Sequence, residues 1–188
     1  IGTNTLDIIR KFSTEFSVHS LSCFSNIDLL SEQIQEFKPQ VVTVQQEEQK
    51  AVIQEKFPHL AIELGQEGLA QIATSSTVDM VVAGIVGSAG LYPTYSAIEK
   101  GKTIALANKE TMVLAGELMT QKAQETGSQI LPIDSEHNAI FQSLVGHSYH
   151  GIEKLILTAS GGPFRDLSLE KFSEITVELA LQHPTWNM

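Results

Sequence analysis

Residues 79–107 read DMVVAGIVGSAGLYPTYSAIEKGKTIALA, and this stretch decides the fold class. Its apolar run from Asp79 to Ile85 predicts a buried strand, Leu91 to Lys100 predicts a helix, and Thr103 to Ala107 predicts a second strand. Gly101 stands where a helix commonly ends on a glycine. A strand, a helix and a strand in this order predict two parallel strands with a helix packed on their face.

The same alternation continues on both sides of this stretch. Apolar residues at Ile27, Leu30, Ile34 and Phe37 recur with helical spacing, and Pro39 ends that helix. The other predicted helices are Thr3–Phe12, a segment from Ala51 to Phe57, Gly68–Ala73, Glu110–Thr126 and Ser135–Leu144, and the other predicted strands are one containing Cys23, Val41–Val44, Leu60–Leu64, Gln129–Ile133 and Ile152–Leu157.

These elements predict an α/β fold, a Rossmann-like doubly wound parallel sheet with helices on both faces. Ligands of such sheets bind at the carboxyl ends of the strands, so the important loops follow Cys23, Ala83, Ala107, Ile133 and Thr158. A doubly wound domain normally opens with a strand and a glycine-rich turn, whereas here Ile1 and Gly2 lead directly into a helix. We therefore expect the first strand to lie outside this sequence.

Composition and net charge limit the kinds of molecule that the chain can bind. The chain has 188 residues, 42% of them hydrophobic, and 22 acidic against 12 basic residues give a net charge of −10. That charge repels nucleic acid, although a few local groups suffice for one small phosphorylated ligand. Cys23 is the only cysteine, so no internal disulfide can form. The most apolar run, Met80 to Leu91, is too short to span a bilayer, and we expect no membrane partner.

The segment Asp134-Ser135-Glu136-His137-Asn138 follows a predicted strand and is the first candidate for chemistry. Asp134 and Glu136 share a face in an extended chain, and two carboxylates suit Mg²⁺ or Mn²⁺. Alternatively, Asp134 caps the helix that follows, with Glu136 favouring its dipole. The pattern alone favours capping.

Four further segments have both a functional and a purely structural interpretation. Lys109 can meet an anionic or carbonyl ligand or be a solvated surface charge, and Asn108 can be only a helix cap. Glycines in residues 84–90 and 158–164 permit close approach of a ligand, or form ordinary tight turns. His183-Pro184-Thr185-Trp186 suggests a mobile lid or an anchored core residue.

Together and in this order, these segments resemble the 1-deoxy-D-xylulose 5-phosphate reductoisomerase family along the whole chain. The most specific match is DSEHNAIFQ at residues 134–142. The other matching stretches are Ile1-Gly2 with Thr5-Leu6-Asp7, Gly84–Pro93, Gly101–Ile104 with Ala107–Glu110, Leu131–Ile133, Ser160–Arg165 and His183–Trp186.

The resemblance implies a role for individual positions. It implies cofactor-binding residues, which are Ile1, Gly2, Asn26, Asn108 and Glu110. It implies that Asp134 and Glu136 are two of three metal ligands and, with Lys109, catalytic. It implies substrate-binding residues, which are Lys109, Ser135, Glu136, Ser160, His183 and Trp186, the last in a lid. The family's third metal carboxylate would lie beyond Met188.

The resemblance further implies an NADPH- and metal-dependent enzyme of isoprenoid synthesis, acting on a phosphorylated sugar. Residues 1–130 would be the NADPH-binding domain and residues 131–188 the start of an α+β catalytic domain, and the 188-residue chain alone would be inactive. A homodimer in the bacterial cytoplasm, or in a plastid, is expected. NADPH should be preferred to NADH, although Phe24 stands where the family usually has a small residue in the loop that binds the adenosine. The alternatives are another two-domain NAD(P)-dependent oxidoreductase, which needs no metal, and a non-catalytic nucleotide-binding module.

Overall fold

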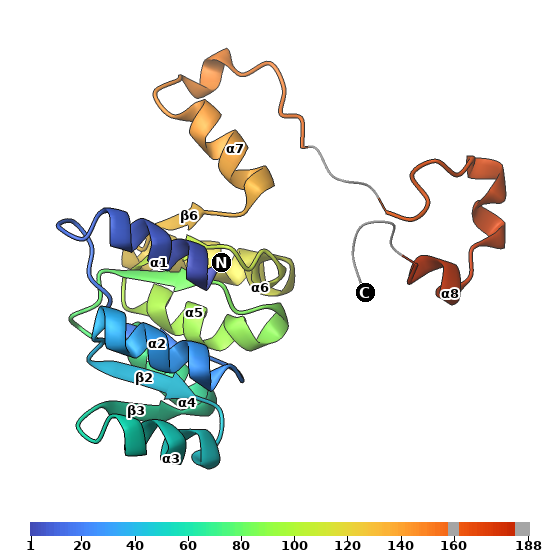
Figure 1. The fold of residues 1–188 in the computed structure, drawn as a ribbon. Helices are drawn as coiled ribbons and strands as arrows, with labels where there is room; N and C mark the ends of the chain where they lie inside the picture. The colour runs from blue at the N-terminus through green and yellow to red at the C-terminus, as the bar shows by residue number, and fades with distance from the viewer. Residues whose placement is uncertain (158–161, 183–188) are drawn as a thin grey trace. The chain divides into compact units, whose positions relative to one another are not determined.

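The computed structural model describes residues 1–157 and 162–182, which fall into two compact units, Ile1–Asn138 and Ala139–Met188. Helices and strands alternate through the first unit (Figure 1). Its strands are β1 (Ser20–Ser22), β2 (Val41–Val44), β3 (Ala61–Leu64), β4 (Met80–Ala83), β5 (Thr103–Leu106) and β6 (Ile130–Pro132). Its helices are α1 (Gly2–Lys11), α2 (Ile27–Phe37), α3 (Glu47–Lys56), α4 (Gly65–Thr74), α5 (Leu91–Glu99) and α6 (Glu110–Thr126), and α7 (Ser135–Leu144) begins in it.

The strands form two separate three-stranded sheets, both parallel. One has the order β1-β2-β3, with Val42 opposite Leu21 and Ile62. The other has the order β4-β5-β6, with Ile104 opposite Val81 and Ile130. The carboxyl ends of β4, β5 and β6 therefore meet at one edge of their sheet, which is where parallel sheets hold ligands.

Each sheet has its own apolar core. The core of the first sheet contains Leu30, Ile34, Val42, Val44, Ile53 and Ile62. The core of the second includes Ala97, Ile98, Ile104, Leu106 and Met119. A fully buried aliphatic side chain stabilises the fold by about 1.5–3 kcal/mol relative to an exposed one.

Helix α4 connects the two sheets, because it packs on β2 and β3 and also against α5. Gly68 permits this close packing. A Cβ atom on Gly68 would lie 2.8 Å from Cβ of Glu63 and 3.0 Å from Cγ2 of Thr43. Any larger side chain at this position would push the helix away from the sheet.

The α/β class and the alternation of elements predicted from the sequence are confirmed. Four predicted elements have the bounds observed, namely α2, β2, α6 and α7, although α6 has a kink at Ala115, beside Gly116. Cys23 was predicted inside a strand, but β1 ends at Ser22. The expected single sheet is instead two sheets, separated between β1 and β4.

The second unit contains short helices within its described residues, which are η2 (Tyr149–Gly151), η3 (Leu169–Glu174) and α8 (Val177–Ala180). The strand predicted at Ile152–Leu157 is wrong, because these residues have no strand structure. Leu155, Ile156 and Leu157 are 60–69% exposed, and a strand needs a pairing partner to bury such side chains. None of the helices in the described parts of the chain is long and apolar enough to cross a membrane.

Candidate functional site

The junction between β5 and α6 is held against the end of β4. The backbone N–H groups of Ala107 and Asn108 both donate to the carbonyl of Ala83, at 3.0 Å each. Asn108 is 4% exposed, and its Nδ2 donates to the carbonyls of Ile85 and of Gly87, the latter at 2.8 Å. Asn108 therefore fixes the glycine-rich loop after β4 to the end of β5.

Gly90 is the position that makes this arrangement possible. A Cβ atom there would lie 2.7 Å from Nδ2 of Asn108 and 2.9 Å from the carbonyl oxygen of Ile85. The glycines of this loop were predicted to allow close approach of a cofactor or a tight turn. At Gly90 the group that approaches is the Asn108 amide.

The junction between β6 and α7 is the next one along the same edge. The N–H of Ile133 donates to the carbonyl of Leu106 at 2.9 Å, which keeps this junction beside β5. Asp134 then caps α7, because its Oδ2 accepts from the backbone N–H of His137 at 3.1 Å. The same oxygen lies 2.7 Å from Nδ1 of His137. Nδ2 of Asn138 donates to the carbonyl of Pro132 at 2.6 Å.

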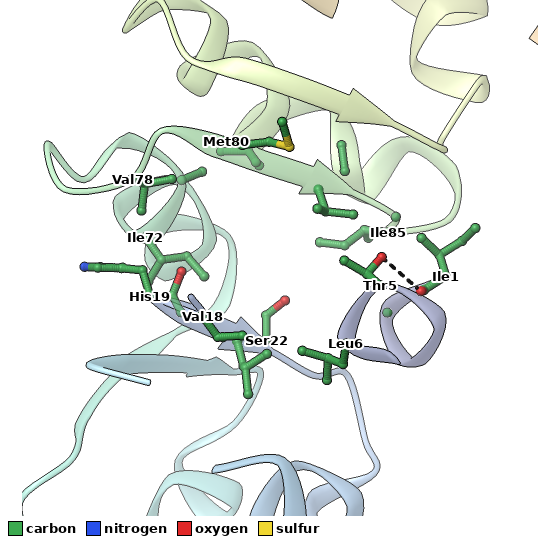
Figure 2. Close-up of a pocket in the computed structure, with 18 of the residues that line it drawn as sticks. Ile1, Thr5, Leu6, Val18, His19, Ser22, Ile72, Val78, Met80 and Ile85 are labelled. Carbon is green, nitrogen blue, oxygen red and sulfur yellow. Dashed lines mark hydrogen bonds between the residues drawn. The ribbon is translucent and has the colours of Figure 1, made fainter. Parts of the chain in front are cut away.

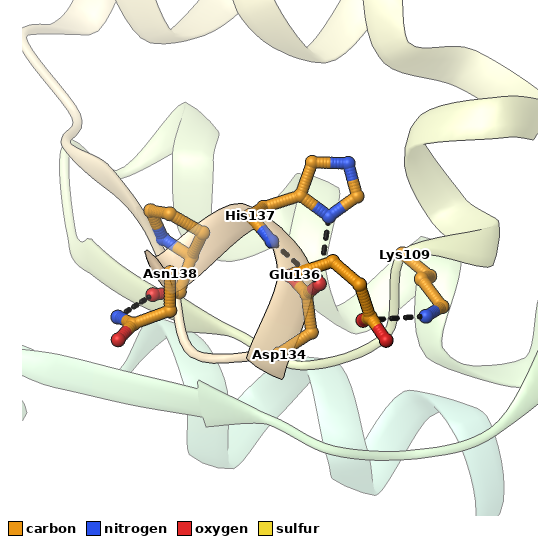
Figure 3. Close-up of polar contacts among 6 residues, drawn as sticks. Lys109, Asp134, Glu136, His137 and Asn138 are labelled. Atoms are coloured by element: carbon orange, nitrogen blue, oxygen red, sulfur yellow. Dashed lines mark hydrogen bonds and ion pairs between the residues drawn. The ribbon is translucent and has the colours of Figure 1, made fainter. Parts of the chain in front are cut away.

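An ion pair joins the two junctions. Nζ of Lys109 lies 3.2 Å from Oε2 of Glu136, and Figure 3 shows the two side chains pointing toward one another. The side chains of Lys109 and Glu136 are 53% and 34% exposed, so a ligand can reach both. We call Lys109, Asp134, Glu136 and His137 the carboxylate corner.

Both carboxylates of the corner are held in the ionised form. Partial burial raises the pKa of Asp134, but the hydrogen bonds from the His137 ring and backbone outweigh it, so this pKa lies below its ordinary value. Hydrogen bonds from its own backbone N–H and from Lys109 lower the pKa of Glu136. The corner therefore presents two negative charges beside one positive charge at neutral pH.

The chemistry of these donors fits a hard divalent cation. Carboxylate oxygens are the ligands that Mg²⁺ and Mn²⁺ prefer. Both bonds to the Asp134 carboxylate use Oδ2, which leaves Oδ1 for another partner, so capping and metal binding are compatible. No group of three metal-binding side chains occurs in the described residues, so Asp134 and Glu136 would need further oxygen ligands.

Four of the five predicted cofactor residues lie at one cavity, and Asn108, which precedes Lys109 of the corner, is among them. Ile1, Gly2, Asn26 and Asn108 line one cavity of about 830 Å³ in the first unit, part of which is drawn in Figure 2. Asn26 caps α2, since its Oδ1 accepts from the N–H of Leu29 at 3.1 Å. Glu110 begins α6, is exposed, and does not line the cavity.

The remaining residues predicted to bind the substrate lie only in part within the described residues. Ser135 begins α7, beside the corner, whereas Ser160, His183 and Trp186 lie outside the described residues. Phe24 is 80% exposed, and its carbonyl accepts from Nε2 of Gln49 at 2.9 Å. The contact of His137 with Asp134 was not predicted, although the i, i+3 spacing of a helix cap could have indicated it.

Two family models match the chain. The model of 1-deoxy-D-xylulose 5-phosphate reductoisomerase matches residues 1–116, and the model of the C-terminal domain of the same enzyme matches residues 130–188. The two matches cover most of the chain. The residues between them, 117–129, include the second half of α6.

Similar proteins have the same description. A 1-deoxy-D-xylulose 5-phosphate reductoisomerase of Clostridium perfringens is 49% identical over 192 residues, and one of Geotalea daltonii is 48% identical over 190. Each alignment covers all of this chain and 50% of the relative. The chain thus spans about half the length of the curated relatives it matches.

Solved structures agree in fold. A crystal structure of DOX-P reductoisomerase in complex with NADPH, fosmidomycin and magnesium is 40% identical, with a TM-score of 0.80, over 100% of this chain and 49% of that one. The enzyme from Zymomonas mobilis in complex with NADPH is 37% identical, with a TM-score of 0.80, over 96% and 48%. The chain belongs to the 1-deoxy-D-xylulose 5-phosphate reductoisomerase family.

Proposed function

We propose that this chain supplies the NADPH-binding part and two metal ligands of an enzyme that converts 1-deoxy-D-xylulose 5-phosphate to 2-C-methyl-D-erythritol 4-phosphate. The observation that carries this proposal is the carboxylate corner, where Asp134, Glu136 and Lys109 converge at the carboxyl ends of β5 and β6. Relatives named as this enzyme, one of them bound to NADPH and magnesium, support it. The chain spans about half of those relatives, so we expect it to be inactive alone.

In this proposal Asp134 and Glu136 hold Mg²⁺ or Mn²⁺, and Lys109 stays beside them. The metal would polarise the substrate carbonyl and stabilise the alkoxide charge that forms during rearrangement. Lys109 adds a positive charge beside the metal. In this arrangement the Glu136 carboxylate interacts with both Lys109 and the cation. Ser135 lies beside the corner at the start of α7, where it can contact the substrate. Ser160 and His183 are proposed to bind the substrate, and Trp186 to belong to a lid that excludes water.

The cofactor would occupy the edge of the first unit. When bound, NADPH would supply a hydride to the substrate. Ile1 and Gly2 begin α1, whose N-terminal N–H groups suit a phosphate. Asn26 lies at the start of α2, and Asn108 and Glu110 lie at the start of α6.

The remaining features of the proposal follow from family membership. Residues 1–130 form the NADPH-binding domain, and residues 131–188 begin the catalytic domain. The enzyme is a homodimer of the isoprenoid pathway, in the bacterial cytoplasm or in a plastid, with a phosphorylated sugar as its substrate.

The test is the reaction itself, followed in the complete enzyme that contains this chain. NADPH should be oxidised only when 1-deoxy-D-xylulose 5-phosphate and a divalent cation are both present, and a chelator should stop the reaction. The value of kcat/KM should be higher with NADPH than with NADH. Full turnover after chelation would instead support a metal-independent oxidoreductase, and NADPH binding without turnover would support a nucleotide-binding module.

A further inference from the structure

The side chain of Gln49 joins the loop after β1 to the loop after β2. Its Nε2 donates to the carbonyl of Phe24 at 2.9 Å. Its Oε1 accepts from the backbone N–H groups of Gln45 and Gln46, at 2.8 and 3.1 Å. Since β1 and β2 are parallel, one side chain therefore fixes two loops that follow the carboxyl ends of neighbouring strands.

Capping of α3 accounts for only part of this arrangement. Gln49 stands in the first turn of α3, where a side-chain acceptor commonly bonds back to the N–H of the residue before the helix, here Gln46. This role needs only the oxygen of the amide, and a glutamate would serve it equally well. The bond from Nε2 reaches Phe24, 25 residues earlier in the chain, and adds nothing to the helix. Its effect is to hold the loop after β1.

The loop after β1 has a fixed backbone but an exposed aromatic side chain. The N–H of Cys23 donates to the carbonyl of Thr43 at 3.1 Å, and Asn26 caps α2. Between them, Phe24 is 80% exposed. A ring on a fixed backbone is preorganised for a flat ligand, because only its two side-chain torsions are left to order on binding.

The order of the strand ends places the two halves of the cofactor. This step rests on the proposed function, in which the nicotinamide reaches the substrate at the carboxylate corner. The phosphates are assigned to the start of α1, and Ile1 lies at the end of β4, because a Cβ atom on Gly84 would be 3.0 Å from Cγ2 of Ile1. The adenosine half then extends away from the corner, toward the ends of β1 and β2. Cys23 and Asn26 line the same cavity as Ile1, so the loop after β1 is within reach of the nucleotide.

The charges of the two loops favour a base over a phosphate group. Residues 23–26 and 45–49 contain Glu47 and Glu48 but no lysine, arginine or histidine. Two carboxylates repel a phosphate, whereas adenine is neutral at pH 7 and presents a flat aromatic face. Stacking on an aromatic side chain is a common way for a protein to hold an unpaired base.

We propose that the Phe24 ring stacks on the adenine of the cofactor and that Gln49 is the positioning residue that holds Phe24 in place. Phe24 contacts the ligand, whereas Gln49 acts through the Phe24 backbone. Neither residue takes part in metal or substrate binding. Because Phe24 is exposed, its replacement should leave the fold intact.

The first experiment replaces Phe24 in the complete enzyme and measures the Kd of NADPH by its fluorescence. Phe24→Leu keeps an apolar side chain but removes the aromatic face, so the Kd should rise about tenfold, whereas Phe24→Tyr should stay within about twofold of wild type. Adenosine 2′,5′-bisphosphate, which has the base but no nicotinamide, should show the same loss by calorimetry. Reduced nicotinamide mononucleotide, which has no adenine, should show none. Wild-type affinity of Phe24→Leu for both adenine ligands would overturn the proposal, and so would an equal loss of the mononucleotide.

The second experiment separates positioning from capping. Gln49→Glu keeps the oxygen that caps α3 and removes only the donor to Phe24, so KM for NADPH should rise about three- to tenfold with little change in kcat. Gln54→Glu is the matched control, because Gln54 is half-buried in the same helix and its Nε2 donates to the carbonyls of Phe57 and Pro58, at 3.3 and 2.8 Å. It should leave KM for NADPH unchanged. Equal increases in the two variants, or a wild-type KM in Gln49→Glu, would overturn the positioning role.

The double variant tests whether Gln49 acts through Phe24. If it does, Gln49→Glu combined with Phe24→Leu should bind NADPH about as well as Phe24→Leu alone, because the ring that Gln49 positions is already gone. Fully additive losses would show that Gln49 affects the cofactor by another route, and would contradict the proposal.

Failure of this proposal and failure of the proposed function give different results. If the wild-type complete enzyme neither binds nor oxidises NADPH, the proposed function is wrong, and this proposal is wrong with it. If the wild-type enzyme oxidises NADPH with its substrate, but Phe24→Leu and Gln49→Glu bind NADPH equally well, only the assignment of Phe24 and Gln49 is wrong.

Discussion

The cavity of about 830 Å³ and the carboxylate corner lie in one unit, and they differ in the state of their polar groups. In the cavity, Oδ1 of Asn108 is buried without a hydrogen-bond partner among the described residues, and no lysine or arginine is among the lining residues. In the corner, Lys109 pairs with Glu136, and Asp134 with His137. The corner is therefore already assembled and is suited to a charged ligand, whereas the cavity still has a polar atom without a partner.

The largest expected effect comes from replacing Asp134 by Asn in the complete enzyme. Asn caps a helix about as well as Asp, so α7 and the fold should be retained. If Asp134 holds a metal, turnover should fall about 100-fold or more, since even an outer-shell partner is worth roughly 10–100-fold. Steady-state kinetics and an unfolding curve measure the two effects, and part of the activity should return at high Mg²⁺. Wild-type turnover would leave Asp134 with its capping role alone.

The next effect is expected at Lys109. Lys109→Met removes the positive charge beside the two carboxylates, and kcat should fall about 10- to 100-fold, which is less than the roughly 10²–10³ of a water-excluded group because the Lys109 side chain is half exposed. Lys100→Met is the matched control, since it removes an equal, exposed charge before β5 rather than after it. Equal losses in the two variants would show that only net charge matters.

Asn108 lines the cavity and precedes Lys109 of the corner, and its replacement should mainly change stability. Asn108→Ala leaves the buried carbonyls of Ile85 and Gly87 without their donor, and the free energy of unfolding should fall by about 1–3 kcal/mol. That corresponds to roughly 2–4 °C in Tm per kcal/mol. Asn4→Ala, on the exposed side of α1, is the control. A Tm equal to wild type for Asn108→Ala would show that the loop after β4 is held by other contacts.

The smallest effect is expected between α1 and α2, where Nη2 of Arg10 donates to Glu36 at 2.8 Å. The hydrogen bond from Arg10 lowers the pKa of Glu36 below its ordinary value of 4.5. Because the folded-state pKa is the lower one, the pair stabilises the fold above pH 4.5 and loses this effect as the pH falls through the lowered pKa. Urea midpoints of wild type and Glu36→Gln should differ slightly at neutral pH and converge in acid. A difference that persists in acid would exclude the ion pair as its cause.

The order of elements could be predicted because each one has a local cause. Helix α2 has regularly spaced apolar residues and a cap at Asn26, and Pro39 follows it. The strand β2 is a run of β-branched residues that becomes buried. Ile152–Leu157 is also mostly apolar, but Leu155, Ile156 and Leu157 are exposed, because pairing is a property of the fold rather than of the segment.

The site could be predicted in part. The family resemblance indicated Asp134, Glu136 and Lys109, and parallel topology explains why residues 109 and 136 meet. The position of Asp134 before an expected helix indicated a cap, which the structure confirms. That the side chain of Asn108 holds the glycine-rich loop could not be predicted, because this contact depends on how β4 and β5 are paired.

The most direct test of the account is Mn²⁺ binding to the complete enzyme, followed by electron paramagnetic resonance of the free ion. Asp134→Asn should weaken Mn²⁺ binding at least about tenfold, because the affinity of a hard-cation site depends on its charged ligands. Asp28→Asn, in the first turn of α2, should leave it unchanged. Equal Mn²⁺ affinity in wild type and in Asp134→Asn would contradict the assignment of the carboxylate corner to a metal.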